Sequence, residues 1–196
     1  MKNPFLSLVQ FIDLPKHLHI HYPGPLWAVV AGYMLAIYLT LPLTPILSKA
    51  AFKLIGKRET GIIISVILAM ILLAVLWLAF RYIRKELRLK VLLPFMVTIG
   101  AAANTDNPAE RVHLLEYAIL GFLLYRAMGQ PLGRRIFWTY LLVVLAGFSD
   151  ETIQWILPNR YFDLGDVGLN SIGSACGVWL GVLLRTPVPP PGTNTA

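Results

Sequence analysis

The hydrophobic positions of this chain fall into long apolar runs separated by short polar turns. The run at residues 61–80 carries no charge and has the length of about 20 residues that a helix needs to cross a bilayer. Comparable runs occupy residues 26–47, 136–156 and 167–184, and they predict three further spanning helices. Residues 91–103 are also apolar, but this run is short for a complete crossing and contains a proline.

A sixth helix is predicted at residues 108–128, where apolar residues and a few charged ones lie between two turns rich in Asn, Gly and Pro. The six segments indicate an all-α fold, a polytopic membrane helical bundle of about five to six transmembrane helices, with residues 26–185 as its one domain. Residues 1–25 mix apolar and charged positions and are predicted to lie on the membrane surface. The proline-rich residues 186–196 are predicted to be a disordered tail.

The first apolar run is followed by a predicted connection at residues 48–60. Pro42 and Pro45, near the end of the run, are expected to bend or end its helix. Lys49, Lys53 and Lys57 recur every four residues, so the connection is predicted to contain a short surface helix with one basic face.

The composition is typical of a membrane protein, because 57% of the residues are hydrophobic and only 14% are charged, against about a quarter in soluble domains. The net charge of +7 comes from basic residues in short turns, so anionic lipid is the expected contact and nucleic acid is not a predicted partner. The side of the bundle that holds residues 81–90 and both termini is the richer in basic residues. The positive-inside rule therefore predicts cytoplasmic termini.

Polar side chains gather in two stretches that this topology brings to one membrane side, predicted to be extracytoplasmic. His113, Glu116 and Tyr117 share one face of a helix, and Asp150 and Gln154 share a face near the end of the next. Ionisable residues in a span normally face the bundle interior or a water-filled cavity. The candidate site residues, for a ligand or for a structural network, are His113, Glu116, Tyr117, Asp150, Glu151, Gln154, Arg160, Asp163, Asp166 and Asn170.

Three interpretations of this cluster stay open. The first is a buried polar network that fixes the helix register. The candidate ion-pair partners of Arg160 in such a network are Glu151, Asp163 and Asp166. The second is a binding site for an envelope lipid, a lipid-linked glycan or a partner protein, because arginine suits phosphate or carboxylate groups. The third is a membrane enzyme that acts on a lipid-linked substrate with His113 as its general base.

Metal and cofactor chemistry receives little support from the sequence. No nucleophile motif and no HExxH motif accompanies the cluster. The residues that would have to hold a metal there are His113, Glu116, Glu151 and Asp166. His17, His19 and His21 alternate near the start of the chain, which fits an interfacial segment better than a metal site. No metal ion or cofactor is therefore predicted, and the catalytic residues, if any, are not identified.

Small residues mark one face of the last predicted span. Gly173, Gly177 and Gly181 are four residues apart, a spacing that allows helices to approach closely. The single cysteine, Cys176, lies within this run and is predicted to be a packing residue.

Two blocks of the chain share a pattern with a known family. The first is His113-Leu-Leu-Glu116-Tyr117-Ala-Ile-Leu-Gly121, similar to His-x-x-x-Tyr-x-x-x-Gly. The second is Asp150-Glu151-x-x-Gln154, then Pro158-x-Arg160, Asp163 and Asp166-x-x-x-Asn170-x-x-Gly173. Together they resemble the VanZ-like family of small bacterial membrane proteins over roughly residues 90–185. Where that family often has an Asp-Lys pair before the histidine, this chain has Ala109 and Glu110.

The resemblance implies a multi-pass protein of the bacterial inner (cytoplasmic) membrane with a role in the cell envelope. The family takes its name from a member linked to reduced sensitivity to teicoplanin. No agreed reaction comes with the family, so whether the chain is an enzyme stays open. The expected partners are membrane lipid and either a lipid-linked glycan or a membrane protein, and a structural subunit of a membrane protein complex is the alternative function.

Overall fold

The structure is a computed structural model that describes residues 24–83, 85–105, 108–129, 132–158 and 160–184. Every regular element in these ranges is a helix, which confirms the all-α prediction. The elements in chain order are α2 (Gly24–Thr40), α3 (Leu43–Ile55), α4 (Lys57–Tyr82), the 3-10 turn η1 (Lys85–Leu87), α5 (Arg88–Ala103), α6 (Pro108–Ala127), α7 (Leu132–Ile156) and α8 (Leu164–Leu184). Residues 24 and 25, predicted to end the surface segment, open α2, while the rest of that segment, its histidines and the predicted tail lie outside the described residues.

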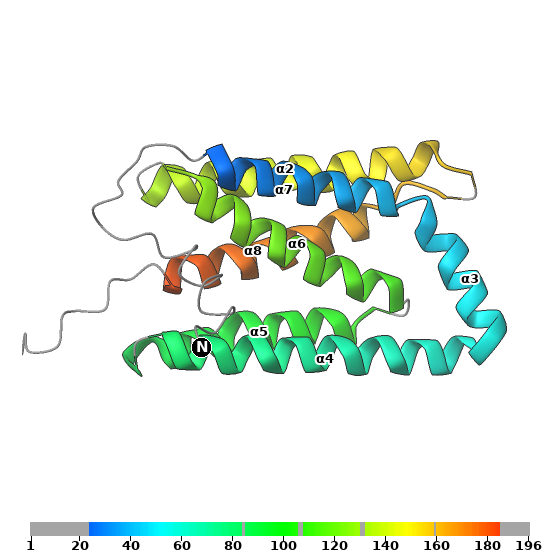
Figure 1. Ribbon diagram of the computed structural model, residues 1–196, viewed down its shortest axis with the longest axis horizontal. Coiled ribbons are helices and arrows are strands. Elements are labelled where there is room, and N and C mark those ends of the chain that lie inside the picture. The colour runs from blue at the N-terminus through cyan, green and yellow to red at the C-terminus, as the bar shows by residue number, and fades with distance from the viewer. Residues whose placement is uncertain (1–23, 84, 106–107, 130–131, 159, 185–196) are drawn as a thin grey trace, which may run out of the picture.

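Paired helices form three layers (Figure 1). α2 and α7 make one outer layer, α4 and α5 the other, and α6 and α8 lie between them, while α3 crosses one end of the bundle from α2 to α4. α6 and α8 make the most extensive helix contact. A buried apolar cluster that includes Val30, Leu120 and Val143 joins α2, α6 and α7. The middle pair is therefore enclosed on both sides, which allows it to hold polar groups away from lipid.

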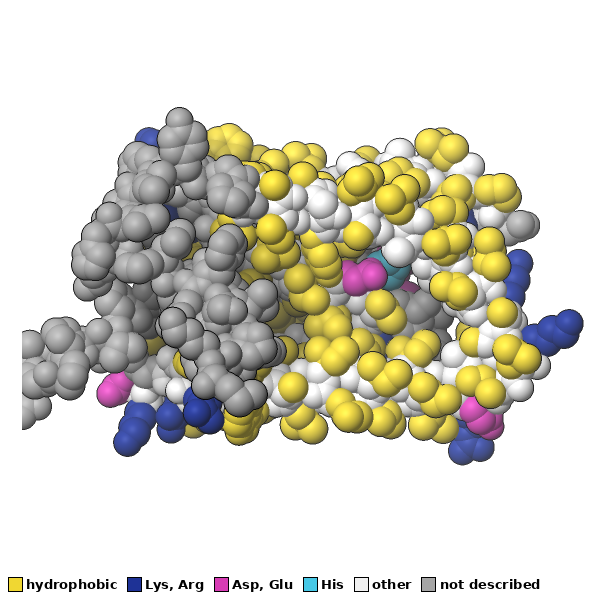
Figure 2. Space-filling view, in the orientation of Figure 1, with side chains coloured by type: hydrophobic (Ala, Val, Ile, Leu, Met, Phe, Trp, Pro, Cys, Tyr) yellow, Lys and Arg dark blue, Asp and Glu magenta, His cyan; other side chains and the backbone are white. Residues whose placement is uncertain are grey.

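Apolar side chains cover much of the outer surface (Figure 2). On α4, Met70, Leu73 and Trp77 are 65%, 65% and 60% exposed, as expected for a helix that faces lipid. In the described ranges, α4, α7 and α8 are long and apolar enough to cross a membrane, and the bent pair α2–α3 makes a fourth candidate. α5 is roughly 24 Å long, and α6 carries four charged residues. The membrane bundle is thus supported, while the count of five to six spans stays a prediction.

Residues 26–47 do not form one continuous helix, although the bent pair that they begin is one candidate span. α2 ends at Thr40, α3 begins at Leu43, and the two helices are bent by 53° relative to each other. Pro42 lies at the break, where its ring nitrogen has no hydrogen to continue the helical bonding. The expectation that Pro42 bends or ends the helix is confirmed. Because the following residues are apolar, the pattern did not indicate that the first helix ends at Thr40.

The predicted connection at residues 48–60 contains the expected helix, but almost none of it is a loop. α3 continues to Ile55, and Gly56 alone separates it from α4. Gly56 has a φ of 95°, a left-handed value that glycine adopts without steric cost. Lys49 and Lys53 are exposed on α3 as predicted, but Lys57 begins α4, so the three lysines do not line one helix. The helix that carries Lys49 and Lys53 is longer than expected and starts earlier.

Glycines allow α6 and α8 to approach closely. The predicted small-residue face of α8 consists of Gly173, Gly177 and Gly181. A Cβ atom on Gly177 would collide with the backbone of Ala118 in α6, and one on Gly121 of α6 would lie 2.5 Å from the carbonyl oxygen of Ser174 in α8. The spacing therefore serves an intramolecular contact, in which each helix supplies glycine where the other presents its main chain.

Pro94 interrupts the hydrogen bonding of α5, and α8 compensates for it. Because Pro94 has no N–H group, the carbonyl oxygen of Lys90 lacks its helical donor. The indole Nε1 of Trp179 donates to that oxygen at 3.1 Å. Cys176 is buried and donates from Sγ to the carbonyl oxygen of Pro94 at 3.4 Å. Cys176 is thus the packing residue that the sequence predicted.

Candidate functional site

The polar cluster lies at the end of the bundle where α6 begins, α7 ends and α8 begins (Figure 1). The antiparallel run of these helices brings the two polar stretches of the sequence together. Asp150 and Glu151 are fully buried, Gln154 is 2% exposed and Asn170 is 1% exposed. Polar groups this deep must be compensated by hydrogen bonds, because an unpaired one costs about 1–3 kcal/mol.

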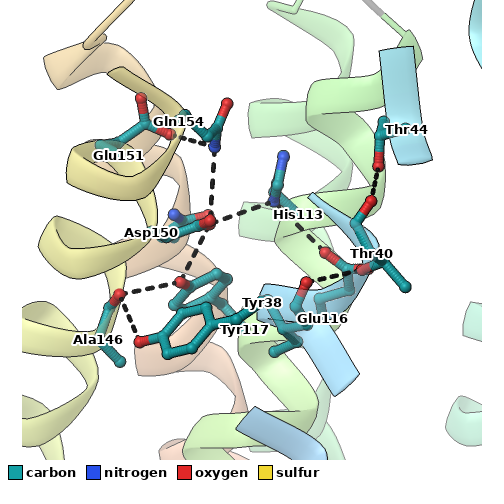
Figure 3. A network of polar contacts seen from close by, with 12 residues as sticks. Tyr38, Thr40, Thr44, His113, Glu116, Tyr117, Ala146, Asp150, Glu151 and Gln154 are labelled. Atoms are coloured by element: carbon teal, nitrogen blue, oxygen red, sulfur yellow. Dashed lines mark hydrogen bonds and ion pairs between the residues drawn. The ribbon is translucent and has the colours of Figure 1, made fainter. Parts of the chain in front are cut away.

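Asp150 joins α7 to α6 (Figure 3). The hydroxyl of Tyr117 lies 3.2 Å from Oδ2 of Asp150 and 3.3 Å from the carbonyl oxygen of Ala146, and it donates toward both. Gln154, one turn further along α7, donates from Nε2 to Oδ1 of Asp150 at 3.5 Å. These donors offset the cost of burying a carboxylate between helices.

His113 lies between two acids. Its Nδ1 is 3.3 Å from Oε2 of Glu116 and 3.8 Å from Oδ2 of Asp150, distances at which a protonated imidazole forms ion pairs. Neither approach has the geometry of a hydrogen bond, since Nδ1 of His113 is a buried atom without one. The other ring nitrogen points away from both acids (Figure 3). Nδ1 of His113 thus lies near the carboxylates of Glu116 and Asp150, and Nε2 faces away from both.

Glu151 ties α7 to the segment that precedes α8. Its Oε1 accepts a hydrogen bond from Nε2 of Gln154 at 2.8 Å, and its Oε2 accepts one from the backbone N–H of Asp163 at 3.0 Å. Arg160 donates to Oε1 of Gln154. Nε2 of Gln154 donates to the two acids of α7, so its Oε1 is free to accept from the guanidinium of Arg160.

The ion pair expected for Arg160 is not formed. The candidate partners from the sequence were Glu151, Asp163 and Asp166. Within the part of the chain that the structure describes, none of them lies at ion-pair distance from Arg160. Asp163 instead caps α8, since its Oδ1 accepts the N–H of Gly165 at 2.7 Å. Asp166, in the first turn of α8, is half-buried and adds negative charge next to the cluster.

Asn170 lies inside the cluster with its amide unused. Gly147 of α7 makes room for it, because a Cβ on Gly147 would lie 3.3 Å from Cβ of Asn170 and 3.6 Å from Cε1 of Tyr117. Neither Oδ1 nor Nδ2 of Asn170 has a hydrogen-bond partner. Buried side-chain amides are nearly always paired, so this donor and acceptor require an explanation.

Two tyrosines of α2 also reach the cluster, and the sequence analysis missed them. Tyr33 donates from its hydroxyl to the carbonyl oxygen of Glu116 at 3.1 Å, and Tyr38 donates to that of Ala146 at 3.2 Å. A buried tyrosine hydroxyl needs a partner, which is the one signal in the sequence that Tyr33 and Tyr38 face polar groups. Nothing in the apolar pattern of α2 identifies those groups.

The acids do not form a metal site. Among the residues that the structure describes, no three His, Cys, Asp or Glu side chains are placed to hold a metal ion together. The set considered from the sequence was His113, Glu116, Glu151 and Asp166. The distances given above suit hydrogen bonding and ion pairing.

The comparisons with known proteins gave one match, to a family model. The family model for VanZ/LLP1 matches residues 29–185, which is more than half of the chain and contains the whole polar cluster. No curated protein and no solved structure matches the chain. On the strength of the family match, the chain belongs to the VanZ/LLP1 family.

Proposed function

We propose that this protein binds the headgroup of an envelope lipid or of a lipid-linked glycan in the polar cluster of α6, α7 and α8. The family match and the apolar helices indicate a membrane protein. The observation that carries the proposal is the unpaired amide of Asn170. A network that serves only to join helices is favourable when all of its members are satisfied, whereas Asn170 offers both a donor and an acceptor to a guest.

The charges of the cluster favour a guest that donates hydrogen bonds. Four carboxyl groups, those of Glu116, Asp150, Glu151 and Asp166, surround one histidine and one arginine, and the arginine donates one of its N–H groups to Gln154. Carboxylates only accept hydrogen bonds when ionised. Sugar hydroxyls and amines supply the donors that such a site needs. A glycan or an aminated headgroup therefore fits this site better than a bare phosphate.

The surroundings suit a ligand at headgroup depth. Trp155 and Tyr161 flank the cluster and are 66% and 76% exposed. Tryptophan and tyrosine are enriched where a bilayer meets water. The side chain of Glu116 is 28% exposed, so the cluster has an acid that a headgroup can reach from the surface.

The proposal is tested by native mass spectrometry of the protein gently extracted from its own membrane. Asn170→Leu removes the unpaired amide at similar volume, so we expect equal or higher thermal stability, with a gain of about 1 kcal/mol, and loss of the co-purifying lipid or glycan. Ser171→Ala, the adjacent position on α8, is the matched control and should retain the ligand. Retention of the same ligand by Asn170→Leu would contradict the proposal, and a stable co-purifying protein would favour a subunit of a complex.

Orientation in the membrane is part of the proposal, with the cluster outside and the termini in the cytoplasm of a bacterial cell. Arg111 and Arg135 are internal, since Arg111 bonds to Ser65 and Arg135 is 4% exposed. Residues 81–90 include five basic residues, against four in residues 48–60 at the cluster end. The positive-inside rule then favours cytoplasmic termini. Alkaline phosphatase fused after Pro158 is expected to be active. An inactive phosphatase fusion, together with a fluorescent green fluorescent protein fusion at the same position, would show the opposite orientation.

An enzyme is the second candidate, and one observation favours it. His113 has one nitrogen between two carboxylates and the other directed away from them (Figure 3). An imidazole held in this way is suited to act as a general base toward a bound group. In the mass spectra described above, a chemically altered lipid that accumulates only with the native His113 would favour this candidate.

A further inference from the structure

Helix α3 lies across one end of the bundle. It runs from the layer of α2 to the layer of α4, at 53° to α2, and every one of its residues is at least partly exposed (Figure 1). Its 13 residues extend over roughly 20 Å, too little to cross a bilayer core of about 30 Å. The candidate spans α4 and α7 run along the long axis of the bundle. A helix across their ends therefore lies near the level of the lipid headgroups.

One face of α3 is an exposed apolar stripe. Leu43, Leu47 and Leu54 share this face, because positions four and eleven residues further along a helix return to nearly the same side. Their side chains are 50%, 66% and 83% exposed. Ala50, also exposed, lies between them on the same face. An exposed apolar face of this kind marks a contact with lipid or with a partner.

Lysines border the leucine stripe. Lys49 and Lys53 are exposed and four residues apart, so they share a second face, roughly a third of a turn from the leucines. Lys57 and Arg58 follow at the start of α4, and Glu59 is the one acid in the sequence of residues 43–59. Lys and Arg side chains project from this end of the molecule in Figure 2. Apolar residues beside a basic face are typical of a helix that lies in the surface of an anionic membrane.

The side of α3 that faces α4 is apolar as well. An apolar groove of about 290 Å³ lies between the two helices, and its lining includes Leu47, Ala51 and Ile63. Thr60 also lines the groove, but its hydroxyl donates to the carbonyl oxygen of Gly56 at 2.7 Å. The surface next to the leucine stripe therefore suits acyl chains.

We infer that α3 is a membrane-surface helix that binds anionic phospholipid, with its leucines among the acyl chains and Lys49 and Lys53 at the phosphates. A lysine in this position lays its apolar stem along the bilayer and keeps its ammonium group at the headgroups. Each lysine near an anionic surface strengthens binding about fivefold. This surface is separate from the polar cluster, and the inference holds whatever the cluster binds.

The test uses the full chain with Ala50→Cys, labelled with a fluorophore, in vesicles of equal parts phosphatidylglycerol and phosphatidylcholine. Bromine atoms, which quench fluorescence on contact, are placed on the acyl chains of one lipid or of the other. The native Cys176 is buried, and the chain without Ala50→Cys gives its background labelling. Both brominated lipids are expected to quench the label, with a local preference of at least about fivefold for phosphatidylglycerol.

The double variant Lys49→Gln, Lys53→Gln should lose this preference and keep the quenching by acyl chains, because the leucines are unchanged. Both lysines are exposed, so the fold should tolerate the change. Lys49→Arg with Lys53→Arg conserves the charges and should keep the preference. Lys85→Gln, which removes an exposed lysine at the far end of α4, is the matched control and should also keep it. Asn170→Leu should keep it too, which separates this surface from the polar cluster.

A label that neither brominated lipid quenches would overturn the inference. If an aqueous quencher also failed to reach the label, α3 would be covered by a partner protein or by a second copy of the chain. If the aqueous quencher reached it fully, α3 would lie in water. Equal quenching by the two lipids in the native chain, a preference that survives in the Lys→Gln double variant, or an equal loss in Lys85→Gln would likewise contradict binding through Lys49 and Lys53.

Discussion

Replacing Gly177 with leucine is expected to destroy the folded bundle. A Cβ at Gly177 would overlap the carbonyl oxygen of Ala118 and lie 2.8 Å from its carbonyl carbon and 2.9 Å from the backbone nitrogen of Phe122. These are main-chain atoms of a helix, so they cannot turn away as a side chain would. The two central helices would have to separate, which we expect to cost at least about 3 kcal/mol.

The loss is measured by thermal unfolding of the purified protein in detergent and by the monodisperse fraction in size-exclusion chromatography. Gly168→Ala is the matched control, because it lies on the same helix with no atom within 4 Å of the added methyl. The control should be neutral or slightly stabilising, since alanine favours a helix more than glycine does. A Gly177→Leu protein as stable as the control would show that α6 and α8 do not pack as described.

The glycine spacing illustrates what the sequence can predict about helix packing. Gly173, Gly177 and Gly181 predicted a close helix contact, because a small-residue stripe has few other uses in a membrane helix. The stripe did not identify the helix that packs against it. That helix is α6, whose only glycine is Gly121, and the match depends on the main chain of both helices. Local spacing therefore predicts that a contact exists, and tertiary structure decides with which helix.

Helix boundaries were less predictable where hydrophobicity continues across a break. Residues 26–47 are apolar throughout, so the pattern alone gives one span. The turn after Thr40 depends on Pro42 and on where α3 can pack, and neither the direction nor the 53° bend is encoded by hydropathy. α4, in contrast, was predicted within a few residues, because a long uncharged run can do little else in a bilayer.

For the candidate site, the sequence predicted the location of the acids better than their partners. Asp150 and Gln154 were expected on one face of α7, and they do interact. The ion pair of Arg160 with an acid was wrong, because an amide oxygen competes for the guanidinium. Tyr33 and Tyr38 were missed because their hydroxyls bond to backbone atoms 83 and 108 positions away. Contacts of that separation follow from the whole fold and not from any local pattern.

The variants Glu151→Gln and Gln154→Glu, which together exchange the carboxylate and the amide, are expected to be strongly coupled in their effects on stability. Both oxygens of Glu151 accept N–H groups, one from Gln154 and one from the backbone of Asp163. Glu151→Gln has only one acceptor oxygen for these two donors. Its amide N–H group would therefore face the N–H group of either Gln154 or Asp163, at a cost of about 2 kcal/mol. Gln154→Glu alone would bring a second carboxylate against Glu151, and we expect a similar loss from repulsion between buried charges.

The double variant should recover the part of the stability that depends on this pair, because the introduced amide then donates to the introduced carboxylate and still accepts the N–H of Asp163, while the bond from position 154 to Asp150 is not restored. The guanidinium of Arg160 gains a charged acceptor in the same position. Thermal unfolding of the native protein, both single variants and the double variant gives the coupling, expected to be about 2 kcal/mol. Additive losses would mean that the two side chains do not bond to each other. The double variant could regain stability without retaining the co-purifying headgroup. That result would mean that ligand binding requires a carboxylate at position 151. The role of Glu151 in binding would then be distinct from its role in holding the segment before α8.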